Sequence, residues 1–235
     1  MAERLYTDAD YILEKLPSFI AQVPLFEQRA VCDSIMVYRF KKNDLIYVEN
    51  TIARDFMCLL EGKVKISKKG AGGRTQIVRI IGSGSYFGYR PFFADGKYIT
   101  QATAFVDSII CCIPMTVMDE LVNSNLKIAN TVISSLAREL GTATERIVAL
   151  TQKHLRGRLA DSLLLMAESF GVNVDNFVMI DIRLSRQDLA DLSNMTLSNA
   201  IRTLSDFVNE KIIKIEHRII SIIDIDKLRK ISETG

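Results

Sequence analysis

The chain has 235 residues, 48% of them hydrophobic, so it can bury a sizeable core and is expected to hold two domains. Its formal net charge is only +2, which excludes a strong overall field for a polyanionic partner and requires any basic surface to be local. No apolar run approaches the roughly 18 to 20 residues of a membrane span, and the start MAERLYTDADY lacks the basic and apolar regions of a signal peptide, so we expect a cytoplasmic protein without a membrane partner.

The first half of the chain changes from a helical to a strand-like pattern. Residues 6–34 favour helices, interrupted by Pro17 and Pro24. Residues 35–114 carry short apolar runs between turn residues, and the glycine-rich stretch Lys69–Gly73 predicts a hairpin turn. Many short strands at close spacing are typical of a barrel or jelly roll, a common shell around a ligand. The strand candidates are Asp44–Val48, Phe56–Glu61, Lys63–Lys68, Gln76–Ile81, Thr100–Ala104 and Ser108–Ile113.

The cysteines give weak support for a metal or redox centre. None of them forms a CxxC pair, and three lie in strongly apolar strand-like runs, where a cysteine usually acts as a small hydrophobic residue. A zinc or iron–sulfur site needs clustered thiolates, so we expect no metal site. Disulfides are not expected in the cytoplasm. The four residues are Cys32, Cys58, Cys111 and Cys112.

A long helix is predicted over residues 126–152, which contain no proline. Its apolar residues are spaced by four or three, which is close to a heptad seam. Such a stripe also fits an ordinary helix that lies on the core of its own domain. We favour a parallel homodimer, because the stripe is long and joins the β-shell to the C-terminal module. The predicted dimer interface consists of Ile128, Val132, Leu136, Leu140, Ala143, Ile147 and Leu150.

The C-terminal third begins with a helix predicted over Arg156–Phe170. Gly171 is expected to end this helix, and a strand is expected over Phe177–Arg183. Two short helices follow, and after them a hairpin. The hairpin strands are Ile212–Glu216 and Ile219–Ile223, joined through His217 and Arg218.

The two short helices have clear start and turn signals. Ser185 is a good N-cap, with Asp188 at the position where a capping box has Glu or Gln. Asn194 tolerates the left-handed conformation of an interhelical turn, and Thr196 caps the second helix. In the first helix, Leu189 and Leu192 share one apolar face. In the second, the predicted buried stripe is Ala200, Ile201, Leu204, Phe207 and Val208, and the predicted outer face is Ser198, Asn199, Arg202, Thr203 and Asp206.

Two helices joined by a tight turn and followed by a β-wing can place the second helix in the major groove of DNA. The same pattern occurs in helical domains that never meet DNA. Short hydrogen-bonding groups and one Arg on the outer face favour the DNA-binding interpretation, because these groups suit base edges and phosphates. A dimer would place two such helices about one DNA turn apart, the arrangement that reads a palindrome.

A β-roll, a long central helix and a winged helix, in this order, resemble the Crp/Fnr family of bacterial transcription regulators. The resemblance covers nearly the whole chain, and its last segment is the most specific. It implies an α+β fold: an N-terminal double-stranded β-helix or jelly roll of the cyclic-nucleotide-binding type, a long central dimerisation helix and a C-terminal winged helix-turn-helix. The segments are LLEGKVKI (Leu59–Ile66), SGSYFGYRPFF (Ser83–Phe93), LTQKHLRGRLADSLL (Leu150–Leu164) and LSRQDLADLSNMTLSNAIRTL (Leu184–Leu204).

The resemblance divides the chain into three regions. We expect an effector domain over residues 1–115, a dimerisation region over 116–152 and a DNA-binding domain over 153–235.

The resemblance also implies which residues contact DNA. Arg186, Gln187, Thr196 and Asn199 match positions that touch phosphate, and Leu197, Ser198 and Arg202 match positions that read bases. Arg218 in the hairpin turn completes the predicted DNA-binding set. Many members carry a Glu where this chain has Ser198, so we expect a different half-site or a weaker reading at that position. Leu197 offers only an apolar contact such as a thymine methyl, and Arg202 can fork onto a guanine.

The predicted effector site departs from that of the cyclic-AMP-binding members. Those members place a Glu after the turn glycine for the ribose and an Arg–Ser pair further on for the cyclic phosphate, whereas here Tyr89 follows Gly88 and the pair reads Ile99-Thr100. A buried phosphate without a guanidinium keeps its desolvation cost and loses its charge-assisted bonds, so cyclic AMP is not expected to be the effector. Arg90 could substitute only by pointing inward. The predicted effector pocket is Gly88, Tyr89, Arg90, Pro91, Ile99, Thr100, Gln101 and Thr144.

The sequence identifies neither the effector nor a cofactor. The iron–sulfur branch of the family needs an N-terminal cysteine cluster that this chain lacks, and both histidines, His154 and His217, fall at or beyond the end of the central helix. A haem would therefore need a Cys or Met ligand. Two rival interpretations are a haem- or redox-sensing regulator and a ligand-binding module that regulates a protein partner. No nucleophile–base spacing supports catalysis, so we do not expect an enzyme. The expected partners are palindromic double-stranded DNA, a second copy of the chain and RNA polymerase.

Overall fold

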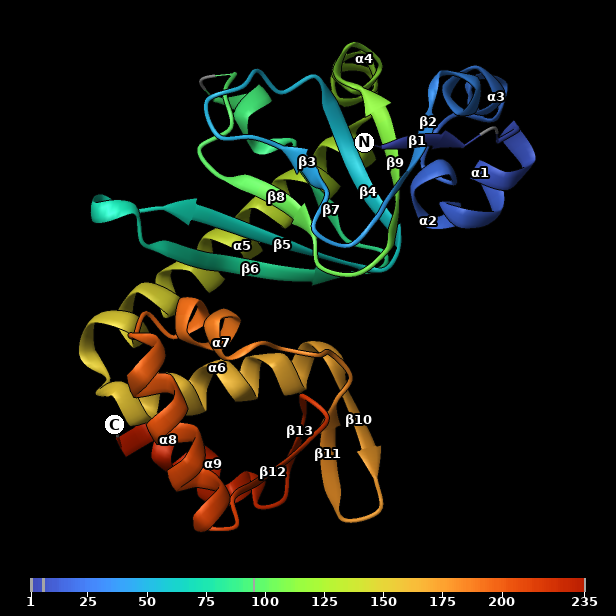
Figure 1. Cartoon of the computed structure of the whole chain (residues 1–235). Coiled ribbons are helices and arrows are strands. Elements are labelled where there is room, and N and C mark those ends of the chain that lie inside the picture. The colour runs from blue at the N-terminus through green and yellow to red at the C-terminus, as the bar shows by residue number, and fades with distance from the viewer. Residues whose placement is uncertain (1, 6, 95, 235) are drawn as a thin grey trace. The chain divides into compact units, whose positions relative to one another are not determined.

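The computed structural model describes residues 2–5, 7–94 and 96–234 (Figure 1). Contacts divide the chain into two compact units, one formed by residues 1–68 and 79–140, the other by residues 69–78 and 141–235. The expected boundaries at residues 115 and 152 are not those of the two units, and the three-part division stays a prediction. None of the helices in the described part of the chain is long and apolar enough to cross a membrane.

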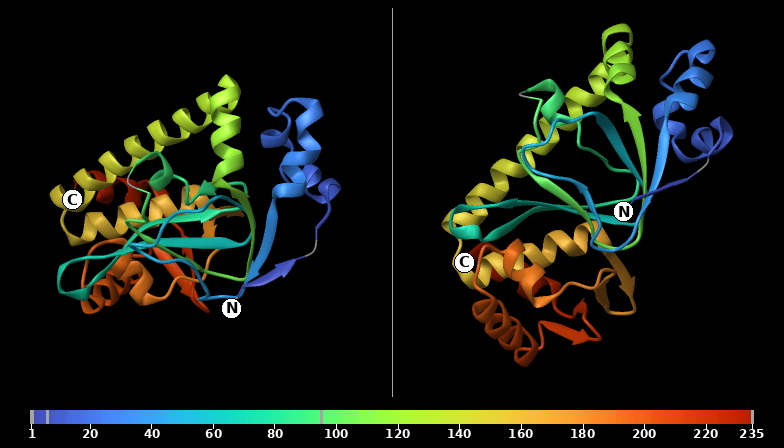
Figure 2. Two further views of the ribbon diagram at one scale, coloured as in Figure 1. Left: turned by 90° about the horizontal axis from the view of Figure 1, so that it is seen from above. Right: turned by 45° about the horizontal axis from the view of Figure 1, so that its top comes forward.

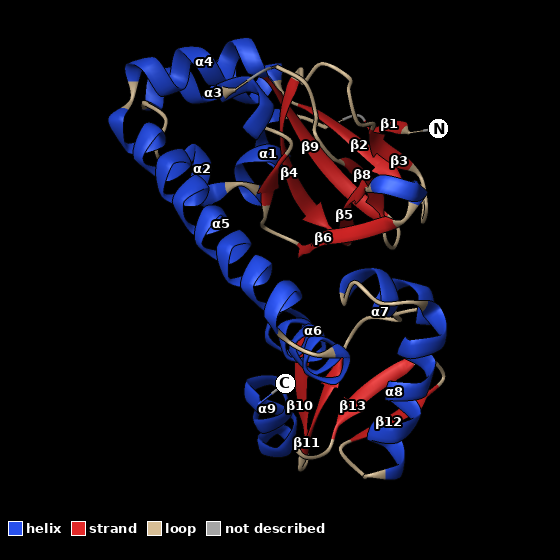
Figure 3. Cartoon of the chain, turned by 90° about the vertical axis from the view of Figure 1, so that its left-hand side faces the viewer, coloured by secondary structure: helices blue, strands red, loops and turns tan. Residues whose placement is uncertain are grey.

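In the first unit, three helices lie between β1 (Glu3–Leu5) and the other strands, and two helices follow the strands. Asp8 caps the first helix by accepting a hydrogen bond from the N–H of Tyr11 at 2.9 Å. The predicted interruptions are confirmed, since one helix ends before Pro17 and another begins directly after Pro24. Figure 2 shows the three N-terminal helices gathered in one cluster beside β1 and β2. The helices are α1 (Ala9–Lys15), α2 (Pro17–Ile20), α3 (Leu25–Ser34), α4 (Met115–Ser124) and α5 (Leu126–Gln152), of which α5 is one uninterrupted helix (Figure 3).

Nine strands over residues 2–114 form two antiparallel sheets in the described part of the chain. One sheet has the order β1-β2-β9-β4-β7 and the other the order β3-β8-β5-β6. This arrangement confirms the predicted roll, although the sequence pattern missed β1, β2 and the short β7. The strands are β1 (Glu3–Leu5), β2 (Met36–Phe40), β3 (Leu45–Tyr47), β4 (Asp55–Glu61), β5 (Lys63–Lys69), β6 (Thr75–Gly82), β7 (Tyr86–Phe87), β8 (Gln101–Ala104) and β9 (Ser108–Pro114).

The central strands β4 and β9 are buried on both faces. Along β4, Met57 and Leu59 belong to the core between the two sheets, whereas Phe56 and Cys58 belong to the core between the first sheet and the helices. Alternate side chains of a strand point to opposite faces, so burial on both faces requires the nearly continuous apolar runs seen in the sequence. The roll is therefore a shell with its own interior core and a second core beneath α4 and α5.

The second unit is a helical module with a four-stranded antiparallel sheet in the order β10-β11-β13-β12. The predicted helices and the hairpin are confirmed, whereas β10 and α9 were not predicted. Its helices are α6 (Leu155–Phe170), α7 (Arg186–Leu192), α8 (Leu197–Asn209) and α9 (Ile225–Thr234). Its strands are β10 (Gly171–Val174), β11 (Phe177–Ile180), β12 (Ile213–Glu216) and β13 (Ile219–Ile222).

Gly171 ends α6, as predicted. Its φ of −76° is an ordinary one that other residues also adopt. A Cβ atom at this position would collide with the carbonyl oxygen of Ala167 and with Val178. Close approach of β10 to the helix end, and not a positive φ, therefore requires the glycine.

Candidate nucleic-acid interface and effector site

The helix-turn-helix begins at the cap of α7. Ser185 Oγ accepts a hydrogen bond from the N–H of Asp188 at 3.0 Å, and the N–H of Ser185 donates to Asp188 Oδ2 at 3.1 Å. This reciprocal pair is the predicted capping box, with Asp in place of Glu. Asn194 has a left-handed φ of 49° in the turn, as predicted. Thr196 Oγ1 accepts from the N–H of Asn199 at 3.3 Å and starts α8.

The buried face of α8 differs from the predicted one at three positions. Thr203, expected on the outer face, is buried, whereas Ile201 and Val208, expected inside, are 44% and 40% exposed. The inward positions follow the spacing of a narrow helical stripe, and Ile201 and Val208 lie one residue beyond it. The residues that face inward are Ala200, Thr203, Leu204 and Phe207.

Arg156 of α6 fixes the far end of α8. Its guanidinium lies 4.9 Å from the centre of the Phe207 ring, and its Nη2 donates to Glu210 Oε2 at 2.6 Å. This hydrogen bond lowers the pKa of the Glu210 carboxyl. The contacts hold the C-terminal end of α8, while the Thr196 cap holds its start, so the helix is anchored at both ends.

The structure places the predicted base-reading residues on the exposed side of α8. Leu197, Ser198 and Arg202 are exposed, and Arg202 Nη2 donates to Asn199 Oδ1 at 3.1 Å. The exposed Ile201 lies on the same face, one helical turn after Leu197, so the face carries two apolar side chains. Sequence reasoning missed Ile201 because an isoleucine within an amphipathic helix is usually counted with the core.

The predicted phosphate contacts outside α8 lie on α7 and in the hairpin turn. Arg186 and Gln187 lie in the first turn of α7, where Gln187 Nε2 donates to Asp191 Oδ1 at 2.6 Å. Arg218 is exposed at the turn between β12 and β13. It and His217 have φ values of 70° and 49°, the positive values that a two-residue type I′ hairpin turn requires at both positions.

A glycine turn in the roll presents a buried tyrosine to α5. Gly88 has a φ of 78°, a conformation that side chains disfavour, and Tyr89 follows it with only 1% of its surface exposed. The ring of Tyr89 packs 4.9 Å from that of Phe56, and its hydroxyl lies 2.9 Å from Ser135 Oγ and 3.2 Å from Glu139 Oε1. Burial raises the pKa of Tyr89, so the hydroxyl keeps its proton for these hydrogen bonds.

The other predicted effector residues are not brought together as one set. Ile99 is 55% exposed, and Thr144 lies on an exposed part of α5 that belongs to the second unit. Arg90 is exposed at the start of the 3₁₀ helix η2 (Arg90–Phe93), which also contains the buried Pro91. Thr100 Oγ1 lies 3.5 Å from the hydroxyl of Tyr47, and Gln101, half-buried, begins β8.

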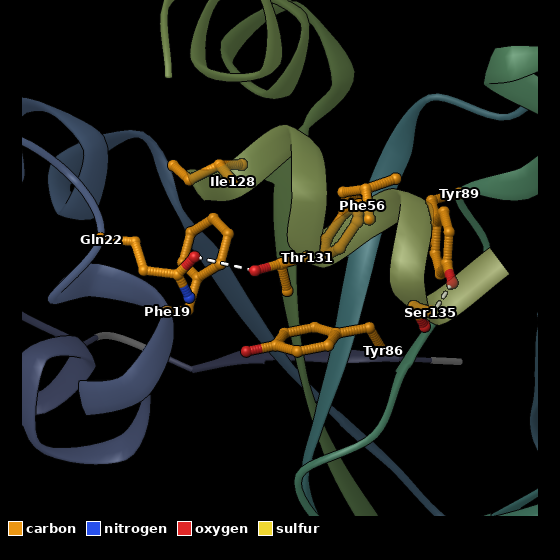
Figure 4. A pocket seen from close by; sticks show the side chains of 9 residues that line it. Phe19, Gln22, Phe56, Tyr86, Tyr89, Ile128, Thr131 and Ser135 are labelled. Carbon is orange, nitrogen blue, oxygen red and sulfur yellow. Dashed lines mark hydrogen bonds between the residues drawn. The ribbon is translucent and has the colours of Figure 1, made fainter. Parts of the chain in front are cut away.

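A cavity beside Tyr89 lies between the N-terminal helices, β4 and α5 (Figure 4). Its volume of about 10 Å³ is barely the room that one water molecule needs. Thr131 Oγ1 donates to Gln22 Oε1 at 2.9 Å across one end of it. Of the predicted effector residues, only Tyr89 lines the cavity. Its lining is Phe19, Gln22, Phe56, Tyr86, Tyr89, Ile128, Thr131, Val132 and Ser135.

Sequence reasoning missed the polar side of α5. Ser135 and Glu139 are one helical turn apart and lie on the same side as the buried Ile128 and Val132. This spacing was visible in the sequence, because i and i+4 residues share a helix face. Arg79 of β6 adds its guanidinium, with Nη1 2.8 Å from Glu139 Oε1.

The α5 stripe differs from the predicted dimer interface in its first half. Ile128 and Val132 are 1% and 6% exposed and belong to the core of their own unit, and Leu136 packs against the same core. These three residues therefore follow the alternative interpretation, a helix on its own domain. Ala143 is exposed and Leu150 half-buried. The strongly exposed apolar residues repeat every seven positions: Leu126, Ile133, Leu140 and Ile147, at 81%, 62%, 70% and 63%.

Cys58, Cys111 and Cys112 are part of the core, as predicted, and Cys32 is part of it as well. Cys58 and Cys111 face each other across β4 and β9, and all four cysteines are buried. Burial raises the pKa of Cys58 to about 12, and it raises that of Cys111 further. Thiols with such pKa values stay protonated at neutral pH. No group of three or more His, Cys, Asp or Glu side chains in the described residues is placed to hold a metal ion.

Two family profiles match the chain in succession. The cyclic nucleotide-binding domain matches residues 37–125, and the Crp-like helix-turn-helix domain matches residues 157–231. Together they span the roll, α4 and most of the second unit's C-terminal segment.

Curated relatives and solved structures agree with these profiles. The chain is 22% identical over 191 residues to a CRP-like cAMP-activated global transcriptional regulator of Mycobacterium tuberculosis, covering 81% of this chain and 85% of the relative. It is 24% identical to a global nitrogen regulator of Nostoc, covering 80% and 85%. The fold resembles that of FixK2 from Bradyrhizobium japonicum, with a TM-score of 0.75, 23% identity and coverage of 84% and 96%.

Crp-family regulators bind DNA, dimerise and are not enzymes. This chain has the features of that family: the two profiles in this order, a roll with a glycine turn, and a capped helix-turn-helix. The chain therefore belongs to the Crp/Fnr family of DNA-binding transcription regulators.

Proposed function

We propose that this regulator is a homodimer that reads a palindromic DNA site through α8 and responds to a small effector other than cyclic AMP. The observation that carries the proposal is the exposed face of α8, which offers Ser198, Arg202 and two apolar side chains on a helix held at both ends. Arg202 reads a guanine in this proposal, and Leu197 and Ile201 contact thymine methyl groups. Arg186, Gln187, Thr196, Asn199 and Arg218 bind phosphates.

Selection of bound sequences from a random double-stranded DNA pool tests this function. We expect an enriched palindrome whose half-sites are separated by about one helical turn, roughly 10 base pairs. RNA polymerase is the expected partner at such sites. A protein that enriches no sequence, and whose weak DNA binding is the same for all sequences, would instead fit a module that regulates a protein partner.

The exposed heptad residues of α5 support the proposed dimer. A stripe repeated every seven residues matches the seam of a left-handed coiled coil, in which each apolar side chain fills a hole on the partner helix. The proposed interface is Leu126, Ile133, Leu140, Ala143, Ile147 and Leu150. This interface keeps the last four residues of the seam predicted from the sequence. Leu126 and Ile133 take the place of the three buried residues of its first half.

Cyclic AMP is expected to bind no more tightly than about 1 mM, equivalent to about 4 kcal/mol. Its phosphate would find Ile99 where relatives of this type have a guanidinium, and Tyr89 is already engaged by Phe56 and α5. Isothermal titration calorimetry measures the affinity, and DNA binding is measured with and without the nucleotide. A ligand that binds equally well to the two conformations of a regulator does not change their populations. The DNA affinity should therefore be the same with and without cyclic AMP. Micromolar binding with a gain in DNA affinity would contradict this proposal.

A further inference from the structure

A charged network joins the roll to α5. Arg79 Nη1 lies 2.8 Å from Glu139 Oε1, and the two side chains are only 31% and 15% exposed. The hydroxyl of the fully buried Tyr89 lies 3.2 Å from the same carboxylate oxygen and 2.9 Å from Ser135 Oγ. One carboxylate on α5 therefore receives a guanidinium from β6 and a phenol from the glycine turn.

The network borders an apolar region of the same unit. Ser135 lines the cavity of Figure 4 together with Phe56 and Val132, and Tyr89 is part of the same core. A guanidinium in such a place needs an anionic partner, because an unpaired charge removed from water is costly. Glu139 fills that need in this structure.

A second guanidinium acts on the same region. Burial raises the pKa of the Tyr47 hydroxyl, while its hydrogen bond to Thr100 and the charges of Arg79 and Arg90 lower it, and Glu139 raises it. Arg79, Arg90 and Glu139 therefore each influence the pKa of this hydroxyl. The Tyr47 hydroxyl lies 3.5 Å from Thr100 Oγ1, and the Tyr89 hydroxyl lies 3.2 Å from Glu139 Oε1.

We infer that Arg79 is the receptor for an oxyanion effector, a small carboxylate or phosphate, and that Glu139 occupies its place in the effector-free protein. This inference rests on the proposed function and names the class of its effector. A guanidinium binds carboxylate and phosphate oxygens with the same paired geometry, so both belong to one ligand chemistry. The bound oxyanion takes the hydrogen bonds of Arg79 in place of Glu139.

The exchange reaches α5 because Glu139 belongs to it. When an oxyanion displaces Glu139 from Arg79, the ion pair and the contact of the carboxylate with Tyr89 are both lost, while the Tyr89 hydroxyl keeps Ser135 Oγ as its hydrogen-bond partner on α5. The effector thus favours a state in which Glu139 of α5 is no longer held by Arg79, and it shifts the population by its difference in affinity for the two states.

Calorimetric titration of the full-length protein with inorganic phosphate, and separately with succinate, tests the inference at constant ionic strength. Glu139→Gln removes the competing charge, so at least one probe should bind about tenfold more tightly than it binds the wild type, because charge-assisted pairs are the strong ones. Arg79→Gln should abolish this binding, alone and in combination with Glu139→Gln. The probe that responds identifies the oxyanion as phosphate or carboxylate.

Matched variants control for charge. Glu120→Gln removes one negative charge from the exposed side of α4, and Arg138→Gln removes one positive charge from the exposed side of α5. Neither should change probe affinity. If Glu139→Gln does not fold, Glu139→Asp withdraws the carboxylate by one methylene and should also strengthen probe binding.

The inference is wrong if the wild type, Glu139→Gln and Arg79→Gln bind the probes equally well. It is also wrong if no Glu139 variant binds either probe. In both cases the ion pair between Arg79 and Glu139 is purely structural. The DNA selection described above reports separately on the proposed function. A protein that binds no specific DNA yet shows the Arg79-dependent gain keeps the oxyanion site and loses the proposed regulation.

Discussion

Leu140→Glu is expected to convert the protein to monomers and to abolish tight binding to a palindromic site. Leu140 is 70% exposed in the single chain, in the middle of the heptad stripe of α5. In the proposed dimer each copy would bury one carboxylate without a partner, at a cost of about 4 kcal/mol or more, equivalent to roughly a thousandfold weaker dimer. Light scattering measures the mass, and a DNA shift assay measures the affinity.

Two other variants on α5 show whether the effect is specific. Ser134→Glu adds the same charge at an exposed position outside the stripe and should leave a dimer. Val132→Glu places the charge in the core of its own unit, where the residue is 6% exposed, and should unfold that unit instead of dissociating a folded dimer. A Leu140→Glu protein that keeps its dimeric mass would rule out this interface.

Arg202→Ala is expected to cost about 1–3 kcal/mol of specific DNA binding and to relax the preference at one base position. The side chain is exposed on the outer face of α8, where its guanidinium already donates to Asn199. Its paired donors match the two acceptors that guanine presents in the major groove. Binding to the selected site and to each single-base variant of it measures the effect.

Arg186→Ala is the matched comparison, because Arg186 is proposed to contact a phosphate. The variant should bind all sequences more weakly by about the same factor. The slope of the logarithm of the binding constant against the logarithm of the salt concentration should become less steep by about one. If Arg202→Ala behaves in that uniform way, Arg202 is a phosphate contact and the proposed reading of a base is wrong.

Local signals in the sequence were enough to predict the caps and the turn of the helix-turn-helix. Ser185, Asp188 and Thr196 act through hydrogen bonds that span three residues, and Asn194 acts through its own backbone conformation. Such interactions depend little on the rest of the chain, which is why the caps and the turn were predicted correctly. The apolar runs of β4 and β9 likewise predicted strands, because a short apolar run between turn residues is typical of a strand buried on both faces.

Only the tertiary structure decided which apolar side chains of the helices face inward. On α5, Ile128 and Leu140 both fit the same near-heptad seam, but Ile128 belongs to the core of its own unit and Leu140 is exposed. On α8, Thr203 is inside and Ile201 outside for the same reason. A helix with apolar residues on two sides has no periodic signal that selects one of them, so the packing partner makes the choice.

The charged network of Arg79, Tyr89 and Glu139 was the feature least predictable from the sequence. Arg79, Tyr89 and Glu139 come from a strand, a turn and a helix separated by up to 60 positions, and nothing in their local patterns connects them. The sequence by itself determined the family, the order of the elements and the caps of the DNA-reading helices, because these depend on short-range patterns. The tertiary structure alone decided the exposed stripe of α5 and the partner of Arg79, because long-range packing sets which side chains meet.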